Sequence, residues 1–188
     1  MFLPGYLLAF VLILGLGFIV FRIIVLREYR RRGRLGLLFS MLELLVWCLF
    51  FCFPFLYSEP GWGWFSSSSA SIGSTRWGIG MLVVSAGFVI AFGTMFWFGM
   101  RRAFGLQVDQ LVKSGLYRIS RNPQIVGGFL LVLGSCLIWL SWYNLGWILL
   151  YTVIAHMMVV TEEEHLGRVF GAEYDDYCQE VPRYLFFI

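Results

Sequence analysis

Residues 115–184 decide the fold: GLYRISRNPQIVGGFLLVLGSCLIWLSWYNLGWILLYTVIAHMMVVTEEEHLGRVFGAEYDDYCQEVPRY. Two apolar segments, 123–142 and 145–160, lie between a polar cluster around Arg121 and a second one that begins at Glu162. A helix needs about 20 apolar residues to cross a membrane, so these segments predict a helical hairpin. Both ends of a hairpin return to the same side of the membrane. The stretch therefore predicts a polar site at a membrane surface.

The composition indicates a membrane protein. Of the 188 residues, 60% are hydrophobic and 13% are charged, and the mean hydropathy is +0.79. A soluble globular domain has about twice that charged fraction. We expect one all-α integral membrane domain over 1–188, in which the variable helices of 1–103 precede a motif-bearing region at 104–188.

Five segments have the apolarity of membrane-spanning helices, although the last is short. They are 6–26, 36–57, 77–99, 123–142 and 145–160. Every Lys and Arg except Arg76 falls at or near one side of this layout. The positive-inside rule then predicts an outside N-terminus and a cytoplasmic C-terminus, with a short cytoplasmic helical tail from Thr161. The loop 58–76 would lie outside, and the cluster Arg27–Arg34 inside.

Local signals add detail to this layout. Gly87 and Ala91 lie four residues apart, which predicts a close helix–helix contact. Tyr143 and Asn144 predict the turn of the hairpin. Glu43 lies inside an apolar span and is either functional or a protonated, hydrogen-bonded residue. We expect His156 to be buried and hydrogen-bonded to a neighbouring helix, and His165 to be solvated.

Other classes of protein fit less well. The basic residues are placed as topology signals, so we expect no nucleic-acid partner. Neither histidine has Cys or His partners at ligand spacing, so we expect no metal. We expect the bilayer itself and a lipid-like small molecule as partners, and we leave the oligomeric state open.

The two polar clusters suggest a ligand with several charges. Arg121 and the helix start at Asn122 and Pro123 would suit an anion, and Gly127 would leave room for a bulky group. Glu162 and Glu163 would accept hydrogen bonds from hydroxyl or amino groups. Each feature has a plain alternative: a helix cap, a basic flank and an acidic helix start. Residue types and spacing alone predict a polar site and do not choose the ligand.

The ordered set of motif residues resembles the isoprenylcysteine carboxyl methyltransferase family, which is related to the phospholipid N-methyltransferases. The resemblance covers residue 104 to the C-terminus. The residues that carry it are Gly115, Tyr117, Arg121, Pro123, Gly127, Glu162, Glu163, Phe170, Gly171, Glu173, Tyr174, Tyr177, Pro182 and Arg183. Two positions depart, because Asn122 replaces the family His and Ile125 replaces a family Tyr.

This resemblance implies a methyltransferase of the membrane, of the kind found in the cytoplasmic membrane of prokaryotes, that uses S-adenosylmethionine and a lipid-like or isoprenoid-like acceptor. Arg121 and Glu162 would be catalytic. The implied cofactor contacts are Tyr117, Arg121, Asn122, Pro123, Gly127, Glu162, Glu163 and Tyr174. Asn122 does not titrate near neutral pH, which favours O-methylation of a carboxylate and leaves N- or S-methylation open. The alternatives are an NADPH-dependent reductase of the sterol-reductase type and a non-catalytic module of the same fold.

Overall fold

The computed structural model describes residues 3–57, 74–99, 102 and 104–185. Most of the loop predicted at 58–76 lies outside these ranges. Within them the chain is helical and has no strand. Its elements are α1 (Leu3–Phe18), the π-helical η1 (Ile19–Val25), α2 (Leu26–Arg32), α3 (Leu37–Tyr57), α4 (Thr75–Phe98), the 3₁₀ turn η2 (Gly115–Arg118), α6 (Pro123–Ile138), α7 (Trp142–Phe170) and α8 (Ala172–Glu180).

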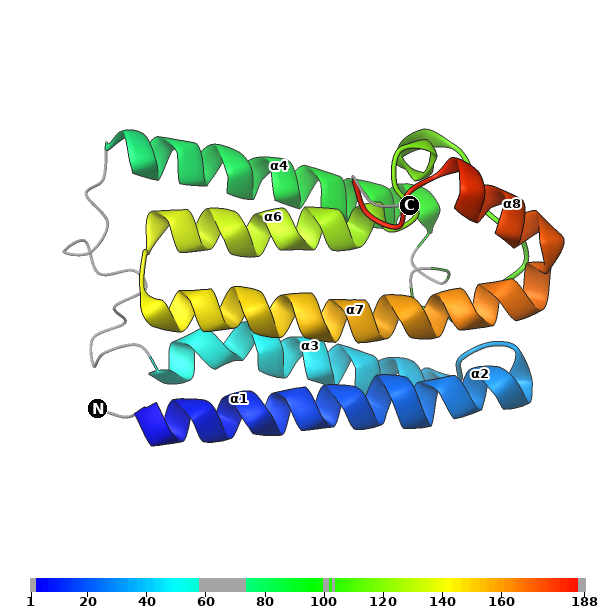
Figure 1. Cartoon of the computed structure of the whole chain (residues 1–188), viewed down its shortest axis with the longest axis horizontal. Helices are drawn as coiled ribbons and strands as arrows, with labels where there is room; N and C mark the ends of the chain where they lie inside the picture. The colour runs from blue at the N-terminus through cyan, green and yellow to red at the C-terminus, as the bar shows by residue number, and fades with distance from the viewer. Residues whose placement is uncertain (1–2, 58–73, 100–101, 103, 186–188) are drawn as a thin grey trace.

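The long helices lie side by side as a bundle (Figure 1). α7 occupies the middle, with α1, η1, α2 and α3 on one side of it and α6 on the other, and α4 packs on the far side of α6. The short α8 folds back at one end of the bundle, where α6 begins, α2 ends and α3 begins. We call this end the α8 end.

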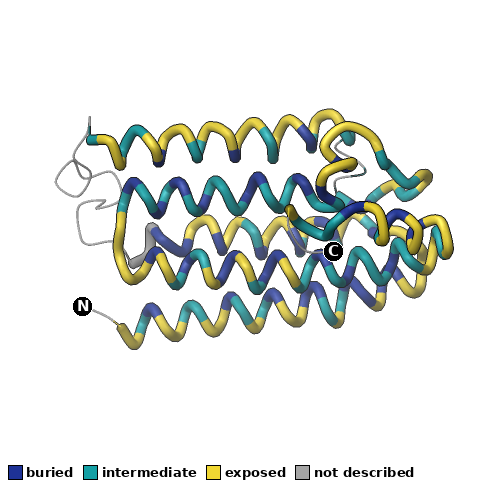
Figure 2. Tube along the Cα trace, turned by 45° about the horizontal axis from the view of Figure 1, so that its top comes forward, coloured by how far each residue is buried: buried dark blue, intermediate teal, exposed yellow. Residues whose placement is uncertain are grey.

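The helices have the length and surface of a membrane protein. Four described helical stretches are long and apolar enough to span: Leu3–Arg32, Leu37–Pro54, Thr75–Phe98 and Trp142–Phe170. Large apolar side chains such as Leu82 and Phe96 on α4 face outward, and Figure 2 shows the outer side of this helix as exposed. The predicted all-α membrane fold is confirmed. α6 has only 16 residues, so the fifth span and the orientation stay predictions.

α7 differs from the sequence prediction. The predicted span 145–160 followed by a separate tail is one helix of 29 residues that runs to Phe170. It begins earlier than predicted because Ser141 caps it by accepting a hydrogen bond from the Asn144 N–H at 3.2 Å, which places Tyr143 and Asn144 in its first turn. No proline interrupts it, and it ends at Gly171, whose φ of +53° suits a glycine. The glutamates at 162–164 therefore project from a rigid helix.

α4 and α6 meet through small residues. A Cβ on Gly87 would lie 2.6 Å from the backbone nitrogen of Leu131, and one on Gly127 would lie 2.5 Å from that of Ala91. Such spacing requires glycine, because real Cβ atoms do not approach backbone so closely. The predicted contact at Gly87 and Ala91 is confirmed, and it fixes where α6 begins.

The other half of the bundle has an aromatic core. The Trp147 Nε1–H of α7 donates to the Phe50 carbonyl of α3 at 3.1 Å, and the two rings stack with centroids 5.3 Å apart. Tyr151 continues this contact toward Trp47, 5.5 Å away. These contacts hold α3 against α7. They also fix which face of α3 packs on α7.

Candidate active site

The three consecutive glutamates of α7 project in three directions, because successive side chains on an α-helix are about 100° apart. Each meets a different set of neighbours at the α8 end. Their partners distinguish a structural role from a role in binding.

Glu163 holds the C-terminal tail. Its Oε1 lies 3.2 Å from Arg121 Nη1 and its Oε2 lies 2.7 Å from Arg183 Nη2. The side chains of Arg121 and Glu163 are only 8% and 11% exposed, so the ion pair is nearly buried. The hydrogen bond from Arg183 Nε to Glu163, at 2.8 Å, raises the pKa of that guanidinium. We call Arg121, Glu163 and Arg183 the tail clamp.

Glu164 holds the first helix. Its Oε1 lies 2.7 Å from Nη2 of Arg22, which also donates from Nη1 to the Thr161 hydroxyl at 3.2 Å. Arg22 belongs to the π-helical η1, and π-helical turns in proteins are frequent at functional positions. Arg22 belongs to none of the motifs predicted from the sequence. An arginine inside an apolar span was the available signal.

Glu162 differs from both neighbours. Across the described ranges it forms no ion pair and no hydrogen bond, and it is half-buried. Burial, followed by the negative charge of Glu162, raises the pKa of the Tyr117 hydroxyl above its usual range. Glu162 also acts electrostatically on Glu43 of α3. The carboxyl group that the sequence predicts to be catalytic therefore lacks a cation from the described part of the chain.

The start of α6 is tied to the tail. Asn122 occupies the N-cap position, but its side chain makes no cap bond. Its Nδ2 instead donates to the Arg183 carbonyl at 3.1 Å, and the Arg121 N–H donates to the Pro182 carbonyl at 2.9 Å. The predicted side-chain cap at Asn122 is therefore wrong, because the returning tail competes for the amide. Pro123 is the first residue of α6, as predicted.

Two predicted cofactor contacts have clear packing roles. Arg121 forms an ion pair with Glu163 and donates to the Cys178 sulfur at 2.6 Å, yet its buried Nε has no hydrogen-bond partner among the described residues. Gly127 faces α4 rather than an open space. Their contacts with a cofactor stay predictions, and for Arg121 the free Nε–H is the atom available.

Tyr117 and Tyr174 are both buried, at 9% and 5% exposed. The Tyr177 hydroxyl donates to the Tyr117 carbonyl at 2.6 Å, which joins α8 to η2. The Tyr117 hydroxyl accepts from Gln124 Nε2 of α6 at 3.3 Å. These bonds bring η2, α6 and α8 together around the clamp, so the distant motif residues of the sequence do meet.

Both histidines differ from prediction. His165 is buried at 3% exposed and stacks on Tyr29 with ring centroids 4.1 Å apart, because α7 continues into the bundle instead of entering solvent. His156 is exposed, and its Nδ1 pairs with the Tyr184 hydroxyl at 3.1 Å, so its partner is the tail and not a neighbouring helix.

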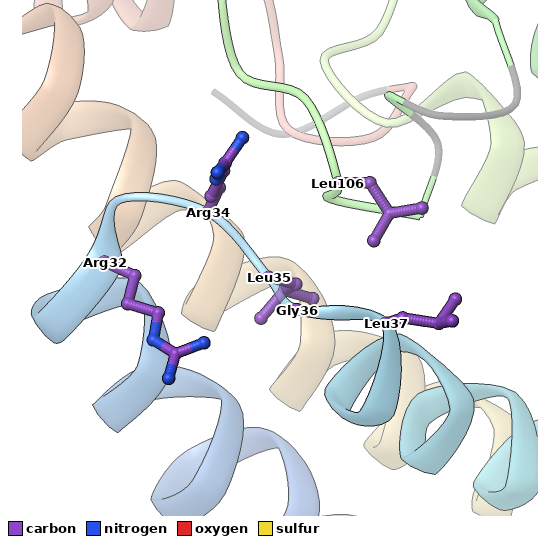
Figure 3. A pocket seen from close by; sticks show the side chains of 6 residues that line it. All are labelled: Arg32, Arg34, Leu35, Gly36, Leu37 and Leu106. Atoms are coloured by element: carbon purple, nitrogen blue, oxygen red, sulfur yellow. The ribbon is translucent and has the colours of Figure 1, made fainter.

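A hollow of about 470 Å³ opens beside the turn between α2 and α3 (Figure 3). Arg32 and Arg34 line it together with apolar side chains, and Leu106 reaches it from the loop before η2. Arg32 pairs with Glu28 at 3.1 Å. Arg34 forms no ion pair in the described part of the chain, so its charge is available to an anion.

A family model described as phospholipid methyltransferase matches residues 71–173, more than half of the chain. The chain belongs to the phospholipid methyltransferase family. This confirms the predicted resemblance, and the protein is a membrane methyltransferase. Neither the curated proteins nor the solved structures contain a match.

The family match covers only part of the site. The methyltransferase region 71–173 contains α4, η2, α6 and α7, and with them Tyr117, Arg121 and Glu162. Glu43, Tyr174 and Arg183 lie outside it. Among the described residues no group of three His, Cys, Asp or Glu side chains is arranged to hold a metal.

Proposed function

We propose that the protein transfers a methyl group from S-adenosylmethionine to the amine of a phospholipid-like acceptor. The observation that carries this proposal is the difference among the three glutamates of α7. Glu163 and Glu164 have arginine partners, whereas Glu162 has no cation among the described residues. An unpaired carboxylate away from water is costly, so its retention supports a cationic ligand.

The chain offers suitable groups for this cofactor. The Glu162 carboxylate would accept from its ammonium group, and the free Nε–H of Arg121 would donate to its carboxylate. Tyr117 and Tyr174 would lie beside it, with Asn122, Pro123, Gly127 and Glu163 holding the frame. When bound, S-adenosylmethionine supplies an electrophilic methyl group and leaves as a neutral thioether. The protein aligns the acceptor and excludes water.

The hollow at the α2–α3 turn supports a phospholipid as the source of the acceptor. Arg34 supplies a guanidinium that has no ion pair with any residue the structure describes, which suits a phosphate. The first turn of α3 adds backbone N–H groups that lack partners within the helix. Leu37, 63% exposed beside them, would contact an acyl chain. Glu162 has no cation among the described residues, so an amine acceptor fits this site better than the carboxylate acceptor that the sequence favours, because two anionic groups repel.

The proposal is tested by calorimetric binding of S-adenosylhomocysteine to the protein purified in mild detergent. We expect micromolar binding by the wild type and at least a tenfold weaker affinity for Glu162→Gln, a loss of about 1.4 kcal/mol or more. Glu180→Gln is the matched control, because it removes the same charge from an exposed position on α8. Glu162→Gln is preferable to Arg121→Ala, which would leave Glu163 buried beside a single partner.

A methyl-transfer assay and a second binding measurement identify the acceptor and the class of cofactor. Mass spectrometry of lipids after incubation with S-adenosylmethionine should show added methyl groups on short-chain phosphatidylethanolamine, with a lower rate for Arg34→Gln than for Arg27→Gln. NADPH should not bind. A folded wild type that binds NADPH and not S-adenosylhomocysteine would favour the reductase alternative, and binding of neither would favour a non-catalytic module.

A further inference from the structure

Glu43 is a buried acid that the proposed function leaves unused. It lies on α3, and it is 5% exposed. Val46 and Phe50 follow it at helical spacing, are fully buried and belong to the same core. Since Phe50 packs on Trp147 of α7, Glu43 lies on the face of α3 that turns toward α7. Its Oε1 has no hydrogen-bond partner among the described residues.

The groups around Glu43 do not neutralise it. Glu162 of α7 and Tyr29 of α2 both interact with it electrostatically. Tyr29 stacks on His165, whose Nε2 is likewise buried and without a hydrogen-bond partner in the described ranges. A Cβ on Gly105 would lie 2.5 Å from the Tyr29 hydroxyl, so the loop before η2 packs against Tyr29. We call Glu43, Glu162, Tyr29 and His165 the acidic chamber.

The charges of Glu43 and Glu162 indicate which kind of ligand the acidic chamber would bind. Two carboxylates that interact through a poorly solvated region repel unless one takes a proton or positive charges separate them. The nearby arginines are engaged elsewhere, because Arg22 and Arg30 pair with Glu164 and Arg121 pairs with Glu163. The cofactor would bring one cation to Glu162. A protonated amine beside Glu43 would be a second cation, and it would allow both acids to be ionised.

We propose that Glu43 binds the protonated amine of the acceptor and takes its proton. This inference rests on the proposed function, because it requires a methyl acceptor that is an amine. An ammonium nitrogen has no lone pair and must lose a proton before it reacts. One N–H proton passes to the Glu43 carboxylate and leaves a neutral amine. The carboxylic acid returns that proton to water after the product leaves.

Glu43→Gln tests the proposal, because it removes the charge and the proton acceptor while preserving the shape. We expect turnover of dihexanoyl phosphatidylethanolamine to fall about 100-fold, while the affinity for S-adenosylhomocysteine stays within twofold of the wild type. Glu28→Gln is the matched control: Glu28 is also a buried glutamate, at 5% exposed, but its Oε1 lies 3.1 Å from Arg32 Nε. It should retain turnover.

A binding measurement adds a readout that is independent of turnover. Tryptophan fluorescence of the wild type, titrated with dihexanoyl phosphatidylethanolamine and with dihexanoyl phosphatidylethanol, compares a lipid with and without the amine. We expect the wild type to bind the amine lipid at least tenfold more tightly, and Glu43→Gln to lose that preference.

The outcomes separate the two proposals. Wild-type turnover and amine preference in Glu43→Gln would overturn the role of Glu43 and leave the proposed function intact. A wild type that binds no S-adenosylhomocysteine would overturn the proposed function and this inference together. If Glu43→Gln does not fold, equal binding of the two lipids by the wild type is sufficient to reject the role of Glu43.

Discussion

The tail clamp and the acidic chamber lie at the same end of the bundle and use adjacent glutamates of one helix, but their charges are arranged in opposite ways. In the clamp, Glu163 lies between two arginines. In the chamber, Glu43 and Glu162 interact electrostatically, and neither forms an ion pair with a cation from the described part of the chain. The clamp completes its interactions within the protein, whereas the chamber, on the proposed function, would complete its own with a ligand. One short acidic run would then serve both stability and binding.

Removal of the acid from the clamp should have the largest effect on stability. Glu163→Ala leaves Arg121 nearly buried without its counter-ion and releases Arg183, and we expect the free energy of unfolding to fall by about 3–5 kcal/mol. Denaturation in mild detergent measures this. Glu162→Ala is the internal comparison and should change stability by less than about 1 kcal/mol. Equal losses at both positions would contradict the division between clamp and chamber.

The contact between α4 and α6 should contribute independently of the clamp. Gly87→Ala forces a Cβ against the Leu131 backbone, and we expect a loss of about 1–3 kcal/mol in the same unfolding measurement. Gly93→Ala is the control on the same helix, because a Cβ there meets nothing within 4 Å. It should be neutral or slightly stabilising, since alanine favours helix over glycine. If Gly87→Ala left the unfolding free energy unchanged, the close contact between α4 and α6 at this position would be contradicted.

Glu43 of the acidic chamber should lower the stability of the folded protein. Glu43→Met replaces a buried acid, whose Oε1 lacks a hydrogen-bond partner among the described residues, with an apolar side chain of similar length. We expect a gain of about 1 kcal/mol in unfolding free energy together with loss of turnover. Differential scanning fluorimetry beside the methyl-transfer assay measures both. A clear loss of stability in Glu43→Met would assign Glu43 a structural role instead.

The bond between α8 and η2 should have the smallest effect. Tyr177→Phe removes the donor to the Tyr117 carbonyl and should cost about 1 kcal/mol. Burial raises the pKa of Tyr177 to about 12 from its usual value of 10. The folded state therefore keeps a proton that the unfolded state loses, so this contribution is full below pH 10 and is lost as the pH rises toward 12.

The variant Tyr177→Phe should accordingly lose less stability than the wild type between pH 10 and pH 12. Tyr143→Phe, at a half-exposed tyrosine on α7, is the control and should match the wild type. An unchanged pH slope in Tyr177→Phe would show that the hydroxyl is not the titrating group.

The class of fold and the family follow from the amino-acid order alone, and the motif residues of the candidate site are predicted from it. Apolar length and the positions of Arg and Lys identify membrane helices because the hydrocarbon imposes a minimum span and penalises charge. Small residues at helical spacing indicated the contact at Gly87 and Ala91 because backbones approach only where side chains are small. The order of residues from Gly115 to Arg183 identified the family without knowledge of their contacts.

The partners of each polar side chain depend on how the helices and the tail pack together, which the sequence alone does not reveal. The sequence could not distinguish Glu162 from Glu163 and Glu164. Their partners depend on which residues of the first helix, α6 and the tail pack against each face of α7. The amide of Asn122 bonds to the tail and His165 lies in the core for the same reason: partners distant in the chain compete with local ones. Glu43 acquires a role only when α3 packs on α7, since a buried charge gains its meaning from the groups that surround it.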